Sequence, residues 1–129
     1  MSEARVIPIE VFKSAVILLI GKDEGELRNV FMHVTRESNF SPFGVTRKYF
    51  FGEFMKCCFG KMDSAGFTYV MEGVNAIVVY LPELNNNALV HELVHAADLI
   101  MDNAGIRDAN PSELRAYLVE YLFGKIAKG

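Results

Sequence analysis

The feature that most constrains this chain is an apolar stretch, residues 88–101, that carries polar side chains at helical spacing. It reads ALVHELVHAADLIM, and its apolar residues fall on nearly every side of a helix, which predicts a buried helix. His91, Glu92 and His95 lie within it in the pattern H-E-x-x-H. Residues i and i+4 lie one above the other on a helix, so both imidazoles face the same side. Buried polar groups need partners, and a metal ion would supply one.

Zinc is the metal that this pattern favours. Zn²⁺ accepts imidazole nitrogens at about 2.0–2.1 Å, and two histidines one helical turn apart span such a site without strain. Glu92 lies about 100° further round the helix, where its carboxylate can take a proton from a metal-activated water. We therefore expect His91 and His95 as ligands and Glu92 as general base. A pair of hydrogen-bonded core histidines without a metal is the alternative.

A third ligand must come from an acidic side chain, because no histidine follows His95. The acidic candidates are Asp98, Asp102, Asp108, Glu113 and Glu120. Glu113 is favoured, because a short loop between antiparallel helices returns its turn towards the histidine helix. Glu120, seven residues further on the same face, is the alternative ligand. Glu113 also fits a capping box with Asn110, which needs no metal.

Two further side chains have predicted supporting roles. Tyr117, four residues after Glu113, is placed to stabilise an oxyanion with its hydroxyl, although core packing is the commoner use of such a tyrosine. Asp98 lies three residues after His95, too close along the helix to complete a tetrahedron, and is expected to orient an imidazole.

The remaining patterns predict an α+β fold in a single domain, residues 1–129. It has a small, mostly antiparallel sheet with about three helices, and the active-site helix is followed by an antiparallel C-terminal helix. The expected strands cover residues 5–12 and 15–20, as one bent strand or two short ones, and residues 67–71 and 76–81 as a hairpin. The first expected helix covers residues 24–36 after an Asp23 cap. The second is capped by Asn85, Asn86 or Asn87 and runs to about Asn103, with Gly105 as its stop, and the third runs from Pro111 to about Ile126.

Pro8 favours a sheet edge or a break in the first strand, because proline donates no ladder hydrogen bond. The strand at residues 76–81 is also expected to be an edge, where an extended peptide can pair.

Charge and cysteine content exclude several classes of protein. Lys and Arg number 13 against 16 Asp and Glu, and the net charge of −3 argues against a nucleic-acid partner. The run of basic and aromatic residues at 47–51 is the one feature that would favour binding of a single nucleic-acid strand. Adjacent Cys57 and Cys58 form no disulfide framework, which favours a reducing compartment.

The apolar runs are too short for a membrane span, which needs about 20 residues. Glu3 and Glu10 precede the first run, and acidic residues there argue against a signal peptide. We therefore expect a cytoplasmic protein without a membrane partner.

The C-terminal third resembles a known family. Residues 89–96, LVHELVHA, and residues 112–118, SELRAYL, resemble small phage and prophage proteins of the gluzincin type, which pair H-E-x-x-H-A with E-x-x-A-Y-L. The resemblance covers about the last 45 residues. It implies that His91, His95 and Glu113 bind zinc, that Glu92 is the base, and that a peptide or protein is the substrate. A phage-encoded protein of this kind would act in the bacterial host cytoplasm.

Two departures from the larger gluzincins make zinc binding a better-supported expectation than efficient peptide hydrolysis. Those enzymes place an aspartate four residues after the ligand glutamate, where this chain has Tyr117, and they carry a second domain with an oxyanion-stabilising residue. The expected function is a zinc-dependent metallopeptidase. The alternative is a non-catalytic, zinc-containing accessory or protein-binding module, for which the aromatic cluster at residues 49–59 would supply a partner surface.

Overall fold

The computed structural model describes residues 2–9, 12, 14–37, 66–71, 76–105 and 111–128. This part of the chain forms an α+β fold, as predicted. Its elements in chain order are β1 (Glu3–Ile9), β2 (Ser14–Ile20), α1 (Glu24–Glu37), β3 (Phe67–Met71), β4 (Ala76–Leu81), α3 (Asn86–Asn103) and α4 (Pro111–Lys128). The N-terminal segment is therefore two strands rather than one bent strand. Several residues of the sequence analysis lie outside the described ones: the run at 47–51, the aromatic cluster at 49–59, the two cysteines, Asp108 and Asn110.

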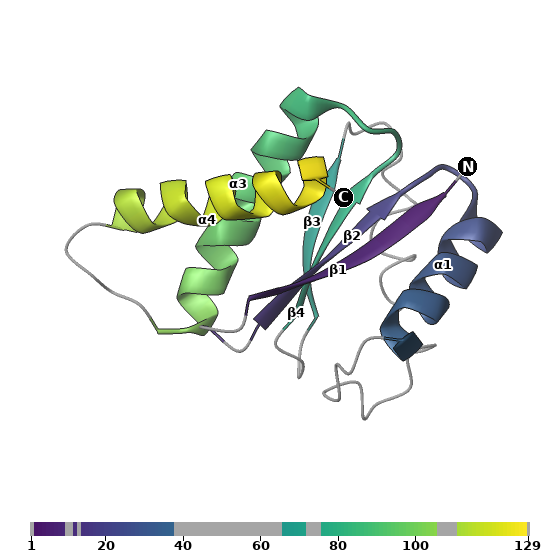
Figure 1. Ribbon diagram of the computed structural model, residues 1–129, viewed down its shortest axis with the longest axis horizontal. Helices are drawn as coiled ribbons and strands as arrows, with labels where there is room; N and C mark the ends of the chain where they lie inside the picture. Colours follow the sequence, from purple (N-terminus) through teal and green to yellow (C-terminus); the bar gives the residue numbers. More distant parts are fainter. Residues whose placement is uncertain are drawn as a thin grey trace.

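The four strands form one mixed sheet in the order β1-β2-β4-β3 (Figure 1). β1 pairs antiparallel with β2, and β3 pairs antiparallel with β4, as the predicted hairpin requires. The two pairs meet where β2 runs parallel to β4, with Ala15 opposite Ala76 and Ile20 opposite Leu81. Two of the three strand pairings are thus antiparallel, and the central one is parallel.

The strand at residues 76–81 is not a sheet edge, and that prediction was wrong. β4 lies between β2 and β3, and all six of its residues are buried. Its sequence, AIVVYL, is apolar without alternation, which is typical of a strand covered on both faces. The edges of the described sheet are β1 and β3. Pro8 lies within the continuous strand β1, which agrees with the edge and not with the break that proline also allowed.

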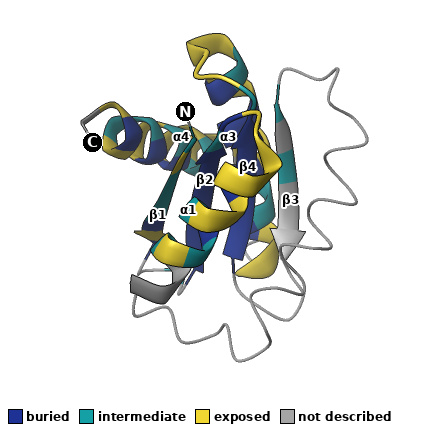
Figure 2. Cartoon of the chain, turned by 90° about the vertical axis from the view of Figure 1, so that its right-hand side faces the viewer, coloured by how far each residue is buried: buried dark blue, intermediate teal, exposed yellow. Residues whose placement is uncertain are grey.

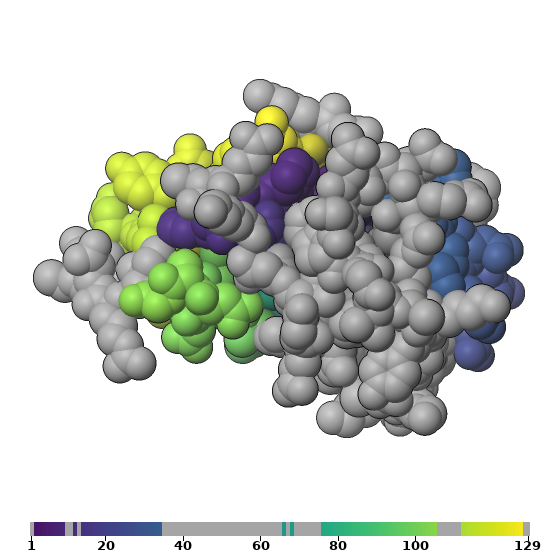
Figure 3. Space-filling model, turned by 90° about the horizontal axis from the view of Figure 1, so that it is seen from below, coloured from purple at the N-terminus to yellow at the C-terminus, as the bar shows by residue number. Residues whose placement is uncertain are grey.

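Helices cover both faces of the sheet. Side chains alternate between the faces along a strand, and Leu18, Ile77 and Val79 join one core cluster with residues of α3 and α4. On the other face, α1 contacts β1 and β2 and buries Leu27 and Phe31 (Figure 2). The view from below shows α1 and α4 at opposite sides of the molecule (Figure 3). None of the described helices has the length and apolar character needed to cross a bilayer.

The predicted helix ends lie within two residues of those in the structure. Asp23 Oδ1 accepts the Glu26 N–H at 2.9 Å at the start of α1, and Asn85 Oδ1 accepts the Ala88 N–H at 3.1 Å at the start of α3. α3 stops before Gly105, whose φ of +69° is the left-handed conformation that glycine adopts readily. α4 then begins at Pro111 and crosses α3, as Figure 1 shows.

The cap at Asn85 predicts a stability difference within a run of three asparagines. Only the Asn85 side chain caps α3, whereas Asn87 lies exposed in the first turn. Asn85→Ala should therefore lower the free energy of unfolding by about 1 kcal/mol. Asn87→Ala should change it by no more than about 0.5 kcal/mol, as is usual at an exposed position. Urea unfolding followed by circular dichroism measures both, and equal losses would contradict the assigned cap.

Candidate metal site

The two histidines of the H-E-x-x-H motif lie on the outward face of α3. The helix contacts β4 and β3, and its residues Leu89, Leu93 and Ile100 are buried in the core. His91 and His95 are exposed, and Val90 beside them is 40% exposed. The prediction of a helix buried on nearly every side was therefore wrong for this face. An exposed imidazole can bond to water, so burial imposes no need for a metal, and the spacing of the two rings becomes the informative observation.

The imidazoles of His91 and His95 are spaced like two ligands of one ion. Their Nε2 atoms are 3.3 Å apart, and the ring centroids are 4.9 Å apart with an interplanar angle of 78°. Two nitrogens that each lie about 2.0–2.1 Å from a tetrahedral zinc ion are about 3.3–3.4 Å apart. The two rings thus fit zinc in number, atom type and separation. Without a metal, the same pair would share one long hydrogen bond.

Glu92 points in a different direction from the histidines. Its side chain is turned towards the edge strand β3 and is only 7% exposed. The Thr68 hydroxyl donates a hydrogen bond of 2.6 Å to Glu92 Oε1, and the same hydroxyl lies 3.2 Å from the Glu92 main-chain oxygen. The motif therefore divides between two environments: two imidazoles face solvent, and the carboxylate between them packs against the sheet.

Gly66 leaves the space that Glu92 occupies. A Cβ atom at this position would lie 2.7 Å from Leu81 Cδ2, closer than real Cβ contacts, and 3.0 Å from Glu92 Cγ, tighter than most of them. Sequence reasoning missed both Gly66 and Thr68, which precede the motif by more than 20 residues. Gly66, just before a strand, was the available signal, because glycine there often marks a close approach of other chain segments.

The predicted third ligands lie on α4 and are not gathered at the histidines. Glu113 and Glu120 are both exposed. Among the residues that the structure describes, no three His, Cys, Asp or Glu side chains are grouped so as to hold a metal ion. Glu120 borders a hollow between α4 and Val94, the neighbour of His95, whereas Glu113 does not. The described arrangement therefore supplies two ligands from α3, and the third remains a prediction.

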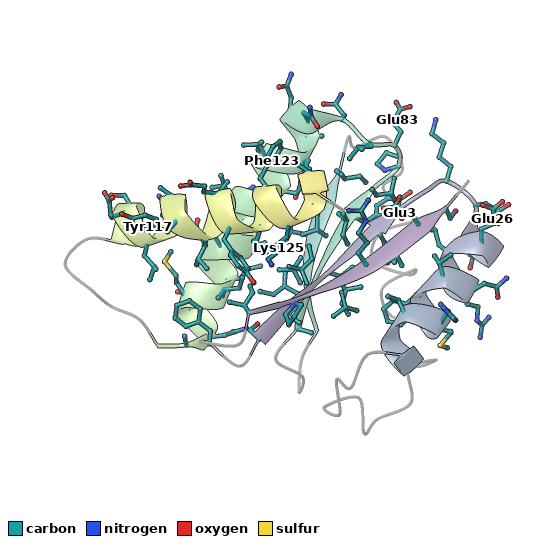
Figure 4. All side chains as sticks on the ribbon, in the orientation of Figure 1. Glu3, Glu26, Glu83, Tyr117, Phe123 and Lys125 are labelled. Atoms are coloured by element: carbon teal, nitrogen blue, oxygen red, sulfur yellow. The ribbon has the colours of Figure 1, made fainter. Side chains whose placement is uncertain are left out.

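Tyr117 and Asp98 have other surroundings than the sequence suggested. Tyr117 is 62% exposed near the start of α4 (Figure 4). Its side chain lines a groove with Pro8, Ile9 and Phe12 at the edge strand β1. Among the described residues that line this groove, neither His91, Glu92 nor His95 is present. Asp98 Oδ1 accepts a hydrogen bond of 2.5 Å from Arg115 Nε, an ion pair that links α3 to α4.

The close packing at Gly66 predicts opposite effects of two glycine-to-alanine substitutions. Gly66→Ala forces Leu81 or Glu92 to move and should lower the free energy of unfolding by about 1–3 kcal/mol. Gly124→Ala is the matched control: it lies within α4, and an added Cβ meets nothing within 4 Å. It should raise the unfolding free energy, by up to about 1 kcal/mol, because alanine is the better helix former. Denaturant unfolding of both variants checks this, and a neutral Gly66→Ala would show that Gly66 is not packed against Leu81 and Glu92 as described.

Comparison with protein-family models, with curated proteins and with solved structures gives no match to this chain. The functional assignment therefore depends on the chain's own residues. Those residues are two imidazoles at the separation of zinc ligands and a buried glutamate between them in the sequence.

Proposed function

We propose that this chain is a zinc-dependent peptidase whose reacting groups lie on α3. The observation that carries the proposal is the 3.3 Å separation of His91 Nε2 and His95 Nε2 on one exposed helix face. Exposure also supports it, since a peptide substrate must reach the metal ligands. The resemblance to small gluzincin-type proteins of phages points to the same chemistry.

Each motif residue has one task in the proposed reaction. His91 and His95 bind the metal through Nε2 and must be neutral to do so. Zinc, when bound, supplies a Lewis acid that polarises the peptide carbonyl and lowers the pKa of water. Glu92 accepts the proton from the attacking water and passes it to the leaving amine. Tyr117 has no task here, because its exposed side chain lines the groove at β1.

Glu113 remains the proposed third ligand, with Glu120 as the alternative. Both are exposed carboxylates on α4, the helix that crosses α3. The resemblance favours Glu113. The hollow that joins Glu120 to Val94 favours Glu120. Zinc content of single variants separates the two.

The substrate is proposed to be an extended peptide, and β3 is the strand that it would join. β3 is an edge of the described sheet, and the Thr68 side chain on this strand contacts the proposed base. A peptide can add to such an edge through main-chain hydrogen bonds. Residues 76–81 offer no such edge, because β4 lies between β2 and β3.

The role of Glu92 predicts loss of hydrolysis without loss of metal. Glu92→Gln keeps the shape of the side chain but removes its basicity, and should lower kcat for peptide cleavage by about 10²–10⁴-fold. Zinc per chain should stay equal to that of the wild-type protein, because Glu92 is not a ligand. Cleavage of a mixture of internally quenched peptides and elemental analysis provide the two measurements.

The same experiment separates the peptidase from the non-catalytic alternative. A wild-type protein that binds stoichiometric zinc and cleaves none of the peptides would support the binding module. Cleavage by Glu92→Gln at the wild-type rate would show that the activity comes from elsewhere.

Metal content tests the ligands directly. Protein purified without added metal should hold one zinc per chain, and His91→Ala or His95→Ala should lose it. Glu113→Ala should also lose zinc if Glu113 is the third ligand, and Glu120→Ala if the alternative holds. The control is Glu24→Ala, which removes an exposed carboxylate from the first turn of α1, as Glu113→Ala does from the first turn of α4. Full zinc in both α4 variants would remove both glutamates as ligands.

A further inference from the structure

A hydrogen bond from the Thr68 side chain connects the edge strand β3 to Glu92, the glutamate of the H-E-x-x-H motif. Its hydroxyl lies 2.6 Å from Glu92 Oε1, a length typical of an O–H donor bonded to an ionised carboxylate. The hydroxyl has one proton, and the nearer oxygen takes it. The Glu92 main-chain oxygen, 3.2 Å away, lies within α3 and accepts the N–H four residues on.

This hydrogen bond restrains a side chain that would otherwise have several orientations. A glutamate has three rotatable bonds, and ordering it costs free energy that a charge-assisted hydrogen bond offsets. Gly66 lets Glu92 Cγ approach the strand, and Thr68 then holds Oε1. With Oε1 bonded to Thr68, Oε2 is the oxygen left to take a proton from water.

The position of Thr68 in the sheet connects this restraint to the substrate. Thr68 pairs with Val79 on the inner side of β3, and the outer side of β3 is the edge where a peptide would pair. A shift of β3 on peptide pairing would therefore move the hydroxyl that orients the glutamate. Binding of the substrate and placement of the base would be joined through one side chain.

We propose that Thr68 is a positioning residue that holds the Glu92 carboxylate in the orientation needed to accept a proton. The inference rests on the proposed function, in which Glu92 is the general base. Thr68 itself touches neither substrate nor metal. It acts through Glu92, so its removal lowers the rate of the chemical step and leaves metal binding intact.

The experiment compares three variants of the full chain loaded with zinc. Thr68→Val removes the hydroxyl and keeps the β-branched shape. Thr68→Ser restores the hydroxyl. Tyr80→Phe is the structural control: it removes the buried hydrogen bond of 2.8 Å from the Tyr80 hydroxyl to the Gly21 carbonyl. The readouts are kcat and KM on internally quenched peptides, zinc per chain, and the ¹³C resonance of the Glu92 carboxyl group.

The expected result is selective. Thr68→Val should lower kcat by about 10–100-fold, the usual effect of losing a residue that orients a group at a metal site. Its KM and zinc content should stay within about twofold of the wild-type values, and its Glu92 carboxyl resonance should move because the hydrogen bond is gone. Thr68→Ser should return both kcat and the resonance towards wild type, and Tyr80→Phe should change neither.

Two results would overturn the inference. One is an unchanged kcat in Thr68→Val when the wild-type protein is active. The other is a Thr68→Ser variant as slow as Thr68→Val, because the missing hydroxyl would then not be the cause. If the wild-type protein binds zinc but cleaves no peptide, the proposed function fails. The Glu92 carboxyl resonance then decides whether Thr68 positions Glu92. A shift in Thr68→Val that Thr68→Ser reverses supports the positioning role, and the absence of a shift rejects it.

Discussion

The central strands β2 and β4 must be covered on both faces, and the remaining elements are arranged around that requirement. Their side chains are buried almost throughout, so each face needs helices to exclude water. α3 and α4 cover one face, and α1 contributes to the other. Because α3 lies on the sheet through its leucines and Ile100, its opposite side must face outward. The histidines are on that side, and their exposure follows from the packing of the core.

The glutamate between the histidines lies where α3 meets β3. A residue next to an outward-facing position falls at the flank of the helix, and here that flank is closed by Thr68 and Gly66. A carboxylate in this place has low exposure and a hydrogen-bond donor. The imidazoles of His91 and His95 are exposed to solvent, and their Nε2 atoms are 3.3 Å apart, a separation that fits two zinc ligands. The proposed function requires a proton acceptor and accessible metal ligands, and Glu92, His91 and His95 would be these residues.

Local patterns predicted much of this fold, and pairings between distant residues decided the rest. Gly105, Pro111 and the run of asparagines at 85–87 marked the ends of the last two helices, because caps and breakers act through neighbouring backbone groups, and the structure selects Asn85 from the run. Whether residues 76–81 form an edge or an interior strand depends on the partner strand β2, some 60 residues earlier in the sequence. Thr68 had no local signal, because its partner Glu92 is 24 residues away and only the folded sheet brings them together. The histidine spacing needed only the helical repeat and was predicted, whereas the exposure of His91 depended on how α3 lies on the sheet.

The parallel pairing of β2 and β4 also bears on how the chain reaches this structure. The strands β1 and β2 are close in sequence, as are β3 and β4. Each of these two pairs can therefore form before β2 pairs with β4. Their junction closes a loop of more than 50 residues, and loop closure of this length slows folding more than it affects stability. Until that junction forms, AVILL in one half and AIVVYL in the other remain open to water and to other chains. Such segments are prone to self-association. The rate of joining the two halves would then set the yield of folded protein, with dilution and low temperature during refolding favouring the native chain over aggregates.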